Sequence, residues 1–540
     1  MRILAHRGNR LQAPENTKIA LVSAYTAGAG ALELDVQLTK DGRLVVSHDP
    51  STERLAGQNH AIIETDLAEL RKLDVGETFK PRGANEFHYR RPEKPGDQIE
   101  TFPHLLGELP DEVPKVVEMK HDSSLETGRR DEFVKKTCDA IAERFKTGEV
   151  VLYSKDPENL RLAREQLPDV RIAAFDWELT PDEQVGLIEQ HDTDGVVIEL
   201  GAILAADGTL TDAGKRLEQL HSARGLRVGA IVYLYRDPAV FTREEYEALR
   251  AHDFVWSLAT DSMLDVQPFV RGRQELVSES FGGTTTNTRQ FSLGYAKANE
   301  YAHVRQEDGV HVDIAEYHGK LKGDSELEEG VWYALRDWPF YSGGGVGYVD
   351  GIEGDFAAEV SYEATRVGQA STLEMAAVNV SPAANRGPER ADGSRFVPGE
   401  RDKSNFFDPH GAPPFAGVEH DEDDGYRINS NSGTAYDNNW YGRPVGDGTA
   451  LAGRLRLERR GPYFSAYYRN DNDAPDWVCV GVARNDSLNE RVFLRCAGKR
   501  WRQELEDDPT KYHPVVPVSF TFRDFEVTRF HDGRDGVADA

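Results

Sequence analysis

Residues 1–50 decide the fold, and they read MRILAHRGNRLQAPENTKIALVSAYTAGAGALELDVQLTKDGRLVVSHDP. Three short apolar runs in this stretch each end in ionisable side chains: Ile3-Leu4-Ala5 in His6-Arg7-Gly8, Ala31-Leu32 in Glu33 and Asp35, and Leu44-Val45-Val46 in His48-Asp49. Parallel strands place their carboxyl ends at one edge of a sheet, so these side chains can converge there. Two histidines, an arginine and two carboxylates in one place predict a metal-assisted phosphoryl site.

The chain up to about residue 270 alternates apolar runs with helix-like segments, the pattern of a parallel α/β sheet. The runs predicted as strands are Arg2–Ala5, Ala31–Val36, Pro114–Met119, Glu149–Tyr153, Arg171–Ala174, Gly195–Leu200, Arg227–Leu234 and Asp253–Leu258. The segments predicted as helices are Thr17–Ala27, Arg129–Phe145, Pro157–Gln166, Pro181–Gln190, Thr211–Ala223 and Thr242–Ala251, with Thr211 and Thr242 as N-caps. This succession of βα units favours a TIM (β/α)8 barrel over residues 1–270, with a doubly wound sheet as the alternative.

A long insertion runs from Asp49 to Pro114, between the second and third predicted strands. We expect a hairpin strand at Leu44–Ser47 before it and a helix at Thr65–Leu73 within it. Insertions over the carboxyl-terminal face of a barrel commonly shape substrate entry.

The sequence pattern changes after Arg271. Residues 271–300 are predicted as a linker, because Gly282–Thr288 is a run of glycine, threonine and asparagine. In residues 301–530 apolar residues alternate with polar ones, as in Phe356–Tyr362 and Val516–Val527. The second half is therefore predicted to be an all-β jelly-roll sandwich.

Composition excludes several function classes. The 540 residues carry a net charge of −29, which argues against nucleic acid and anionic membranes as partners. No apolar run approaches the roughly 18 residues of a membrane span. Cys138, Cys479 and Cys496 are too few for a disulfide framework or a zinc site, although Cys479 and Cys496 could pair. No signal peptide precedes the first strand, so we expect either a cytoplasmic protein or one whose leader was removed.

The candidate metal ligands are carboxylates at strand ends. Glu33 and Asp35 are two residues apart and face the same side of a strand, as do Glu118 and Lys120. Three carboxylate groups suit a hard divalent cation such as Ca²⁺ or Mg²⁺. Lys120 can hold a phosphate oxygen. Each pair alone could equally be a hydrated strand end; their occurrence in order on successive strands favours a site.

The remaining candidates are a cation and two proton-transfer groups. Arg7 is suited to bidentate phosphate contact. His6 and His48 can each take or deliver a proton near neutral pH. Alone, His6-Arg7-Gly8 could be a turn, and His48-Asp49-Pro50 could be an Asx-type turn.

The motifs together resemble those of the glycerophosphodiester phosphodiesterase family, over residues 1 to 268. The matching motifs are His6-Arg7-Gly8, Pro14-Glu15-Asn16-Thr17, Glu33-Leu34-Asp35, Thr39-Lys40-Asp41-Gly42, Val45-Val46, His48-Asp49, Glu118-Met119-Lys120 and the closing Thr260-Asp261. The resemblance implies a TIM barrel whose divalent metal, Ca²⁺ or Mg²⁺, is held by Glu33, Asp35 and Glu118. It also implies that His6 and His48 are general acid and base, and that Arg7 and Lys120 bind the phosphate.

The resemblance implies a metal-dependent phosphodiester hydrolase that acts on glycerophosphodiesters and releases an alcohol and a phosphomonoester. Two alternatives stay open: a phospholipase D-like transferase that stops at a cyclic phosphate, and a non-catalytic carbohydrate- or surface-binding protein on a vestigial barrel. The alcohol side departs from the family, since Tyr233 stands where a tryptophan is common and Asp253-Phe254-Val255-Trp256 replaces a glycine-rich run. Glu199 is either a polar substrate contact there or a carboxylate in water at the rim.

The second half resembles concanavalin-like sandwiches of the laminarinase and lectin type. No glycosidase-type E-x-D-x-x-E run occurs there, which favours binding of carbohydrate over catalysis. Aromatic residues that could stack on sugars, or else belong to the core, are Trp338, Tyr341, Trp440, Tyr441 and Trp477. The loop Asn470–Asp473 is read as a turn, with a Ca²⁺ site as the alternative.

Overall fold

The computed structural model describes residues 1–90, 97–120, 127–145, 149–293, 302–314, 342–365, 371–379, 381, 414–421, 425–432, 446, 449–500, 504–505, 508–512 and 517–531. The chain divides into two compact units. The first consists mainly of Met1–Lys80 and Pro95–Gly272, and the second mainly of Pro81–Lys94 and Arg273–His531. Among the helices that the structure describes, none has both the length and the apolar character needed to cross a membrane.

The first unit contains a closed parallel barrel. Its strands are β1 (Arg2–Ala5), β2 (Ala31–Leu38), β4 (Lys115–Met119), β5 (Val150–Ser154), β6 (Arg171–Ala174), β7 (Gly195–Glu199), β8 (Gly229–Tyr233) and β9 (Val255–Thr260). They follow one another in the sheet, and β1 pairs in parallel with both β2 and β9, which closes the ring. The predicted TIM barrel is thus confirmed, and the open doubly wound sheet is excluded. The short strand β3 (Leu44–Val46) pairs antiparallel with β2.

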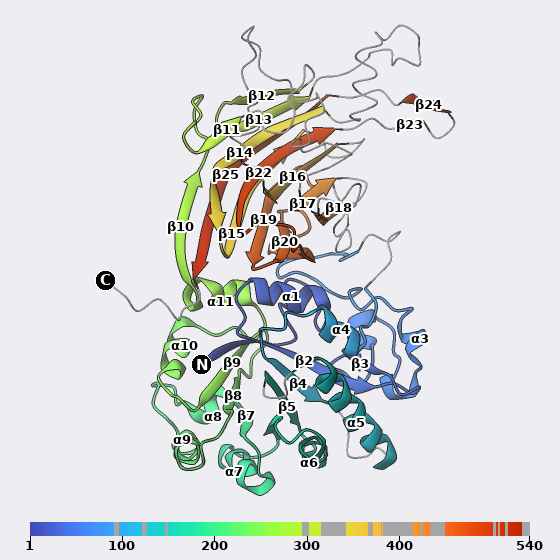
Figure 1. Ribbon diagram of the computed structural model, residues 1–540, viewed down its shortest axis with the longest axis vertical. Coiled ribbons are helices and arrows are strands. Elements are labelled where there is room, and N and C mark those ends of the chain that lie inside the picture. The colour runs from blue at the N-terminus through green and yellow to red at the C-terminus, as the bar shows by residue number, and fades with distance from the viewer. Residues whose placement is uncertain are drawn as a thin grey trace. The chain divides into compact units, whose positions relative to one another are not determined.

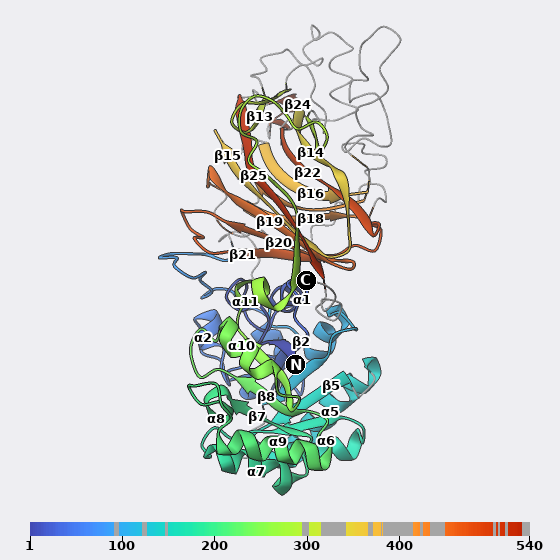
Figure 2. The same cartoon turned by 90° about the vertical axis from the view of Figure 1, so that its left-hand side faces the viewer.

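Helices surround the barrel strands (Figure 1). The long ones are α1 (Lys18–Thr26), α5 (Thr127–Arg144), α6 (Pro157–Gln166), α7 (Pro181–His191), α9 (Asp212–Arg224), α10 (Arg243–Arg250) and α11 (Met263–Val270). Figure 2 shows α7 and α9 on the outer side of β7 and β8. Helix α7 contacts β7, α9 contacts β8, and α10 contacts β9. Both predicted N-caps are confirmed, since the hydroxyls of Thr211 and Thr242 accept hydrogen bonds from Gly214 N (3.0 Å) and Glu245 N (3.2 Å).

Short helical turns lie between these elements: α2 (Glu53–Ala56), the 3₁₀ turn η1 (Ile62–Glu64), α3 (Leu67–Leu70), α4 (Phe102–Glu108) and α8 (Leu200–Ile203). The helix predicted at Thr65–Leu73 is wrong in length. After Leu70 the chain closes two tight turns, from Lys72 N to Glu69 O and from Leu73 N to Leu70 O, which end the α-helical pattern. The barrel interior is apolar, with a core cluster that includes Leu4, Val116, Val151, Val197 and Ile231.

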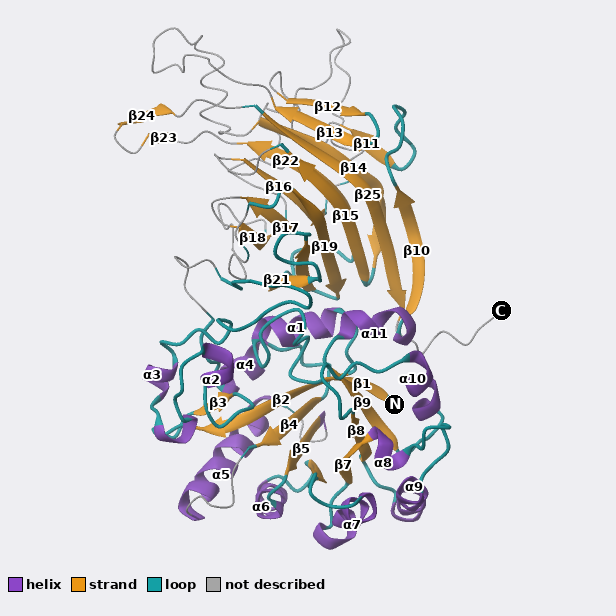
Figure 3. Ribbon diagram, turned by 180° about the vertical axis from the view of Figure 1, so that it is seen from behind, coloured by secondary structure: helices purple, strands orange, loops and turns teal. Residues whose placement is uncertain are grey.

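Every described element of the second unit is a strand, and Figure 3 shows these strands in orange. One sheet has the order β12 (Ala302–Gln306), β13 (Val310–Ile314), β25 (Val518–His531), β15 (Phe356–Ala364), β19 (Ala452–Arg460), β20 (Tyr463–Arg469), β21 (Val478–Arg484), with β10 (Gly272–Glu279) beside β25. The other has the order β11 (Phe291–Leu293), β14 (Ser342–Glu353), β22 (Arg491–Arg500), β16 (Ser371–Val378), β17 (Phe415–Asp421), β18 (Gly425–Asn431). A separate hairpin joins β23 (Glu504–Leu505) and β24 (Asp508–Tyr512).

The strands that pair in this unit are antiparallel, as the alternating sequence predicted, while its jelly-roll identity stays a prediction. The stretch 271–300, expected to be a linker, contains β10 and β11, because apolar residues such as Val277 and Phe291 on either side of the glycine and threonine run are buried. Cys138, Cys479 and Cys496 are all buried and free, so the considered pair between Cys479 and Cys496 is not formed.

Of the aromatic residues considered for sugar stacking, Trp338, Tyr341, Trp440 and Tyr441 lie outside the described residues. Trp477 is half-buried, and the Arg469 guanidinium lies 4.7 Å from its ring centroid. In the loop Asn470–Asp473, which comes before Trp477 in the chain, Asn470 Oδ1 accepts hydrogen bonds from Asn472 N (2.8 Å) and Asp473 N (3.0 Å). These bonds favour the reading of this loop as an Asx-type turn.

Candidate active site

The residues predicted as site residues converge at one end of the barrel. A cavity of about 640 Å³ is lined by His6, Arg7, His48, Glu118 and Lys120. Glu33 and Asp35 come from β2, whose pairing with β4 sets Asp35 opposite Glu118. Glu33 and Asp35 are both completely buried, at 0% exposure. The cavity lining thus supplies two cations, two imidazoles and the Glu118 carboxylate, and the buried carboxylates of β2 come from the strand next to that of Glu118.

The turn after β1 can be built only with glycine at its second position. Arg7 and Gly8 both have left-handed backbones, with φ of 58° and 85°. A Cβ atom at Gly8 would lie 2.4 Å from the Ala20 carbonyl carbon, a distance at which the backbone would have to move. This turn directs the Arg7 backbone N–H to Glu33 Oε2, at 2.9 Å.

The Arg7 side chain is held by buried acids. Its Nη1 donates to Glu15 Oε1 (3.1 Å), and its Nε lies 3.4 Å from Asp35 Oδ2. Burial opposes the charged form of Arg7, but Asp35 and Glu15 raise its pKa above the usual range. Arg54 donates two further hydrogen bonds to Glu15, at 2.7 and 2.9 Å. Asn16 Nδ2 donates to Asp35 Oδ2 at 2.8 Å, so two residues of the Pro14–Thr17 motif orient the site.

The three carboxylates have different protonation preferences. Burial and the nearby Asp35 raise the pKa of Glu33 well above its usual range. Burial raises the pKa of Glu118 to about 7, although Lys120 opposes this. Burial also acts on Asp35, but Lys120 and Arg7 outweigh it and hold the Asp35 pKa well below its usual range. Three carboxylates this close cannot all ionise without additional positive charge.

Lys120 lies between two of these acids. Its Nζ is 2.7 Å from Glu118 Oε2 and 3.3 Å from Asp35 Oδ1. Burial opposes the charged form of Lys120, but Asp35 and Glu118 raise its pKa. The ammonium therefore stays charged and supplies part of the positive charge that the acids need.

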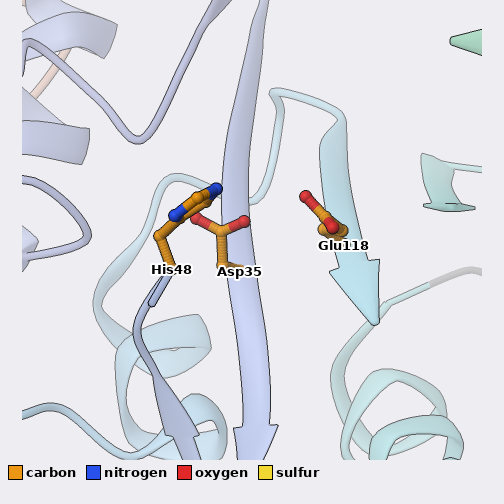
Figure 4. A group of neighbouring side chains, drawn as sticks. All are labelled: Asp35, His48 and Glu118. Carbon is orange, nitrogen blue, oxygen red and sulfur yellow. The ribbon is translucent and has the colours of Figure 1, made fainter. Parts of the chain in front are cut away.

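Asp35, His48 and Glu118 form a group that could hold a metal ion, because one ligand atom from each lies within 4.8 Å of the others. Figure 4 shows the three side chains pointing toward one another, from β2, from the chain after β3, and from β4. This group differs from the predicted trio of Glu33, Asp35 and Glu118. Glu33 already accepts hydrogen bonds from Arg7 N and the Tyr153 hydroxyl, while the His48 imidazole lies close to the other two acids.

Each histidine is oriented by a carboxylate. His6 Nδ1 is 2.9 Å from Asp261 Oδ1, and His48 Nδ1 is 2.7 Å from Asp49 Oδ1. Burial lowers the pKa of both histidines, with Asp261 and Asp49 opposing that shift in part. Both acids have pKa values below the usual range, so they are ionised and accept a hydrogen bond from each histidine's Nδ1. The Nε2 atom of each imidazole is therefore left to take or deliver a proton.

Two residues at the site were not predicted as site residues. Asp261 accepts hydrogen bonds from Arg10 Nη2 (2.6 Å) and Ala239 N (2.6 Å) besides its contact with His6. Tyr153, on β5, donates to Glu33 Oε1 at 2.7 Å and lies 3.1 Å from Glu118 Oε2. The closing Thr260-Asp261 motif was a signal for the first, whereas a tyrosine in an apolar strand gave no signal for the second.

Aromatic rings form one wall of the cavity. Phe175 is 5.6 Å from Trp177, which is 6.3 Å from Tyr233, and the Tyr233 ring meets His6 edge-on at 5.1 Å. Glu199, which β7 places directly beside Tyr233 of β8, also lines this cavity. Tyr233 therefore forms part of the cavity wall, and Glu199, considered either as a polar substrate contact or as a rim carboxylate in water, lines the same cavity.

Comparisons with known proteins match this half of the chain. A model described as the glycerophosphoryl diester phosphodiesterase family matches residues 6–243. A glycerophosphodiester phosphodiesterase of Caldanaerobacter subterraneus is 31% identical over 188 residues, which are 35% of this chain and 68% of that protein. A lysophospholipase D of Mus musculus is 27% identical over 180 residues, 33% of this chain and 50% of that protein.

Other matches are shorter or more distant. Two further bacterial relatives are matched over only 45% and 32% of their own lengths. The solved structure of an Oleispira antarctica phosphodiesterase in complex with the product sn-glycerol-3-phosphate has 20% identity and a TM-score of 0.39, covering 50% of this chain and 96% of that one.

Proposed function

Because the chain belongs to the glycerophosphoryl diester phosphodiesterase family, a family of phosphoric diester hydrolases, we propose that it hydrolyses glycerophosphodiesters with the help of a divalent cation. The products would be an alcohol and a phosphomonoester. The observation that carries this proposal is one cavity that combines two carboxylate-held histidines, His6 and His48, with two cations, Arg7 and Lys120.

The residues present fit a divalent metal. Asp35 Oδ1 is buried and, among the described residues, has no hydrogen-bond partner, only the 3.3 Å ion pair with Lys120. Glu118 is buried with a raised pKa, which is the behaviour of an acid short of positive charge. We infer that Asp35 and Glu118 hold Ca²⁺ or Mg²⁺ with Glu33 as the third ligand, because Asp49 occupies His48 Nδ1 and His48 Nε2 is needed for proton transfer. When bound, the cation supplies Lewis acidity and a template for the phosphoryl oxygens.

The chain's own residues have separate tasks in this scheme. Arg7 and Lys120 bind the non-bridging oxygens of the diester and offset their charge. One histidine Nε2 takes a proton from the attacking water as the water oxygen forms a new bond to phosphorus. The other histidine donates a proton to the alcohol oxygen as its bond to phosphorus breaks. Asp261 and Asp49 keep the two imidazoles in the required tautomer.

The cyclising alternative uses the same residues with a different nucleophile. A hydroxyl of the substrate, instead of water, would attack phosphorus and leave a cyclic phosphate. Hydrolysis in ¹⁸O-labelled water followed by phosphorus NMR distinguishes the two. A persistent cyclic product without label would refute simple hydrolysis.

The test of the proposal is activity of the full chain on a set of glycerophosphodiesters with Ca²⁺, Mg²⁺ or a chelator. We expect activity that the chelator removes, and a loss of at least about a hundredfold in the His6→Ala and Glu33→Ala variants. The matched control is His104→Ala, since His104 is 59% exposed and does not line the cavity. Equal inactivity of wild type and variants on every diester would favour the vestigial carbohydrate-binding barrel instead.

A further inference from the structure

Arg54 lies on α2, in the insertion that follows β3, and it is not among the residues that line the cavity. Its guanidinium nevertheless contacts two acids of the site. Nη1 and Nη2 donate to the two carboxylate oxygens of Glu15, at 2.9 and 2.7 Å, and Nε donates to Asp49 Oδ2 at 2.6 Å. One planar cation thus joins two carboxylates that come from separate segments of the chain.

Each of these carboxylates holds a side chain that takes part in the proposed reaction. Glu15 Oε1 accepts a hydrogen bond from Arg7 Nη1 (3.1 Å), and the same oxygen accepts from Arg54. Asp49 uses one oxygen for His48 Nδ1 (2.7 Å) and the other for Arg54. Arg54 is therefore one acid away from a phosphate-binding cation and one acid away from a proton-transfer group.

The charge of Glu15 is shared between two guanidinium groups. The Glu15 side chain is only 5% exposed, so water screens its attraction to them weakly. With Arg7 as its only partner, the carboxylate would direct its whole negative charge at the group that must attract the phosphate. Arg54 takes up part of that charge, and Arg7 keeps more of its positive charge for the diester.

The contact with Asp49 acts on direction. A carboxylate that is held at both oxygens cannot turn, so the imidazole that donates to it keeps a fixed orientation. The Asp49 side chain is 26% exposed, and without Arg54 water would take its second oxygen and leave the carboxylate free to turn. Because proton transfer needs a short and well-aligned contact, the direction of the opposite imidazole nitrogen affects the rate.

Arg54 is itself held in place at both ends. The Thr78 hydroxyl donates to its backbone carbonyl oxygen, and α2 ends at Gly57, whose φ is 64°. An exposed ion pair between two flexible side chains usually contributes little. A guanidinium that binds both oxygens of a buried acid is stronger and better defined in direction, so Arg54 is suited to fix other groups.

A second arginine, Arg10, stands in the same way behind the other histidine. Its Nη2 donates to Asp261 Oδ2, the acid that holds His6, and to Asp237 Oδ1, each at 2.6 Å. The Asp237 side chain is 84% exposed, so water screens its charge. The second acid of Arg54 is buried instead, which makes the two arginines a matched pair for experiment.

We propose that Arg54 is a positioning residue that serves both parts of the site at once. Through Glu15 it sets the positive charge that Arg7 presents to the phosphate. Through Asp49 it fixes the direction of the His48 imidazole. The inference rests on the proposed function, because both tasks belong to the same reaction.

The test separates affinity from turnover in the Arg54→Gln variant. Hydrolysis of a glycerophosphodiester gives kcat and KM, and competitive inhibition by glycerol phosphate gives Ki, a measure of phosphate affinity. We expect KM and Ki each to rise about tenfold and kcat to fall about tenfold, the lower end of the effect of a hydrogen bond between charged groups. Urea unfolding confirms that the variant is folded. A purely structural role would lower its stability and leave kcat, KM and Ki unchanged.

Two further backgrounds assign each effect to one acid. In a Glu15→Gln background there is no charge to share, so Arg54→Gln should no longer raise Ki. In an Asp49→Asn background the carboxylate that Arg54 fixes is gone, so Arg54→Gln should no longer lower kcat. Non-additivity of this kind is expected only for residues that act through one another.

Two arginine variants serve as controls. Arg161 also joins two carboxylates, those of Glu158 and Glu165, and is 52% exposed against 45% for Arg54, but it does not line the cavity. We expect Arg161→Gln to keep the wild-type kcat, KM and Ki. Arg10→Gln should lower kcat but leave Ki within about threefold of the wild-type value, because its acids do not hold a phosphate-binding arginine.

Added guanidinium provides a rescue that a structural role would not show. In Arg54→Ala, millimolar guanidinium chloride should recover part of the lost activity, because the planar ion can bind both carboxylates. An equal concentration of ammonium chloride should recover less. Such concentrations lie far below those that unfold proteins.

The outcomes are distinct. A higher Ki and a lower kcat in Arg54→Gln, each lost in its own background, support the proposal. A folded variant with both values within about threefold of wild type, a change in only one of them, or effects that persist in both backgrounds overturns it while the proposed function stands. Inactivity of the wild type on every diester with added metal refutes the proposed function, and this inference with it.

Discussion

Replacing Asp261 with asparagine tests how the His6 imidazole is controlled. Asp261 is fully buried and receives three donors, from His6 Nδ1 (2.9 Å), Arg10 Nη2 (2.6 Å) and Ala239 N (2.6 Å). Asparagine has the same shape but offers one acceptor oxygen, and its amide must face His6 or Arg10 as a donor. Facing His6, it would favour the opposite tautomer and leave Nε2 unable to accept a proton.

The size of the effect follows from these contacts. A hydrogen bond to a charged group is worth about 1.5–3 kcal/mol, which corresponds to a loss of roughly ten- to two-hundredfold in kcat/KM if it acts in the transition state. The same substitution weakens the contacts with Arg10 and Ala239, so we expect the free energy of unfolding to fall by about 2 kcal/mol. Because Asp261 raises the pKa of His6 against the effect of burial, its removal lowers that pKa further.

The assay is the pH dependence of kcat/KM on a glycerophosphodiester, with urea unfolding to confirm that the variant is folded. The limb of the profile that belongs to His6 should move to lower pH in Asp261→Asn. Asp49→Asn is the matched variant for His48 and should move the other limb, because Asp49 Oδ1 lies 2.7 Å from His48 Nδ1. A folded Asp261→Asn variant with less than about a threefold loss and an unchanged profile would refute the reasoning.

Three other substitutions have defined expectations. Gly8→Ala should lower the free energy of unfolding by about 3 kcal/mol, and Gly208→Ala by only about 1 kcal/mol, as measured by urea unfolding. Both glycines have φ near 80°, but only at Gly8 would the new Cβ atom lie 2.4 Å from another backbone atom. With a chelator present, wild type should lose about 2–3 kcal/mol of stability relative to Glu118→Gln as the pH rises from 4.5 to 7. The reason is that the Glu118 pKa of about 7 makes the folded state hold a proton that the unfolded chain has released. A difference in stability that does not change with pH contradicts this expectation. Tyr153→Phe should reduce kcat roughly tenfold by removing the donor to Glu33, and an unchanged kcat would exclude this role.

The barrel was predictable because its strands are apolar runs whose ends carry a distinct motif, and Arg171–Ala174 even has the predicted bounds. The contacts that form where the last barrel strand meets the first could not be predicted in the same way. The contact between His6 and Asp261 joins residues 255 apart. The Thr260-Asp261 motif marked Asp261 as a candidate, but nothing local to either residue shows that the two side chains meet. The exchange of Glu33 for His48 in the metal group depends on side-chain direction, because Glu33 uses its oxygens on Arg7 N and Tyr153.

The second unit was predictable in class but less in extent. Alternation of apolar and polar residues, as in Phe356–Tyr362, indicated strands, and β15 covers that stretch. The segment Pro81–Lys94 reads as part of a polar insertion of the barrel, yet it belongs to the second unit, where the Tyr89 hydroxyl donates to Cys479 O at 2.7 Å. A buried tyrosine in a glycine- and proline-rich stretch does not reveal its partner in the sequence.

The charges of the site predict that metal and substrate bind cooperatively. Glu33, Asp35 and Glu118 are three acids, whereas Arg7 and Lys120 supply only two positive charges, and burial disfavours charge on both histidines. A proton on Glu33 or Glu118 would neutralise this net charge of −1, whereas a bound divalent cation would leave a net charge of +1.

A phosphodiester contributes one negative charge, so metal and diester together would leave the buried groups balanced. Each ligand should then increase the affinity for the other by the same factor, about tenfold or more for a coupling of roughly 1.4 kcal/mol. Calorimetric titration of the inactive His6→Ala variant with a glycerophosphodiester in the presence and absence of metal, and with metal in the presence and absence of the diester, measures both factors. Independent binding of the two would show that protons on the acids, and not the bound cation, balance the site.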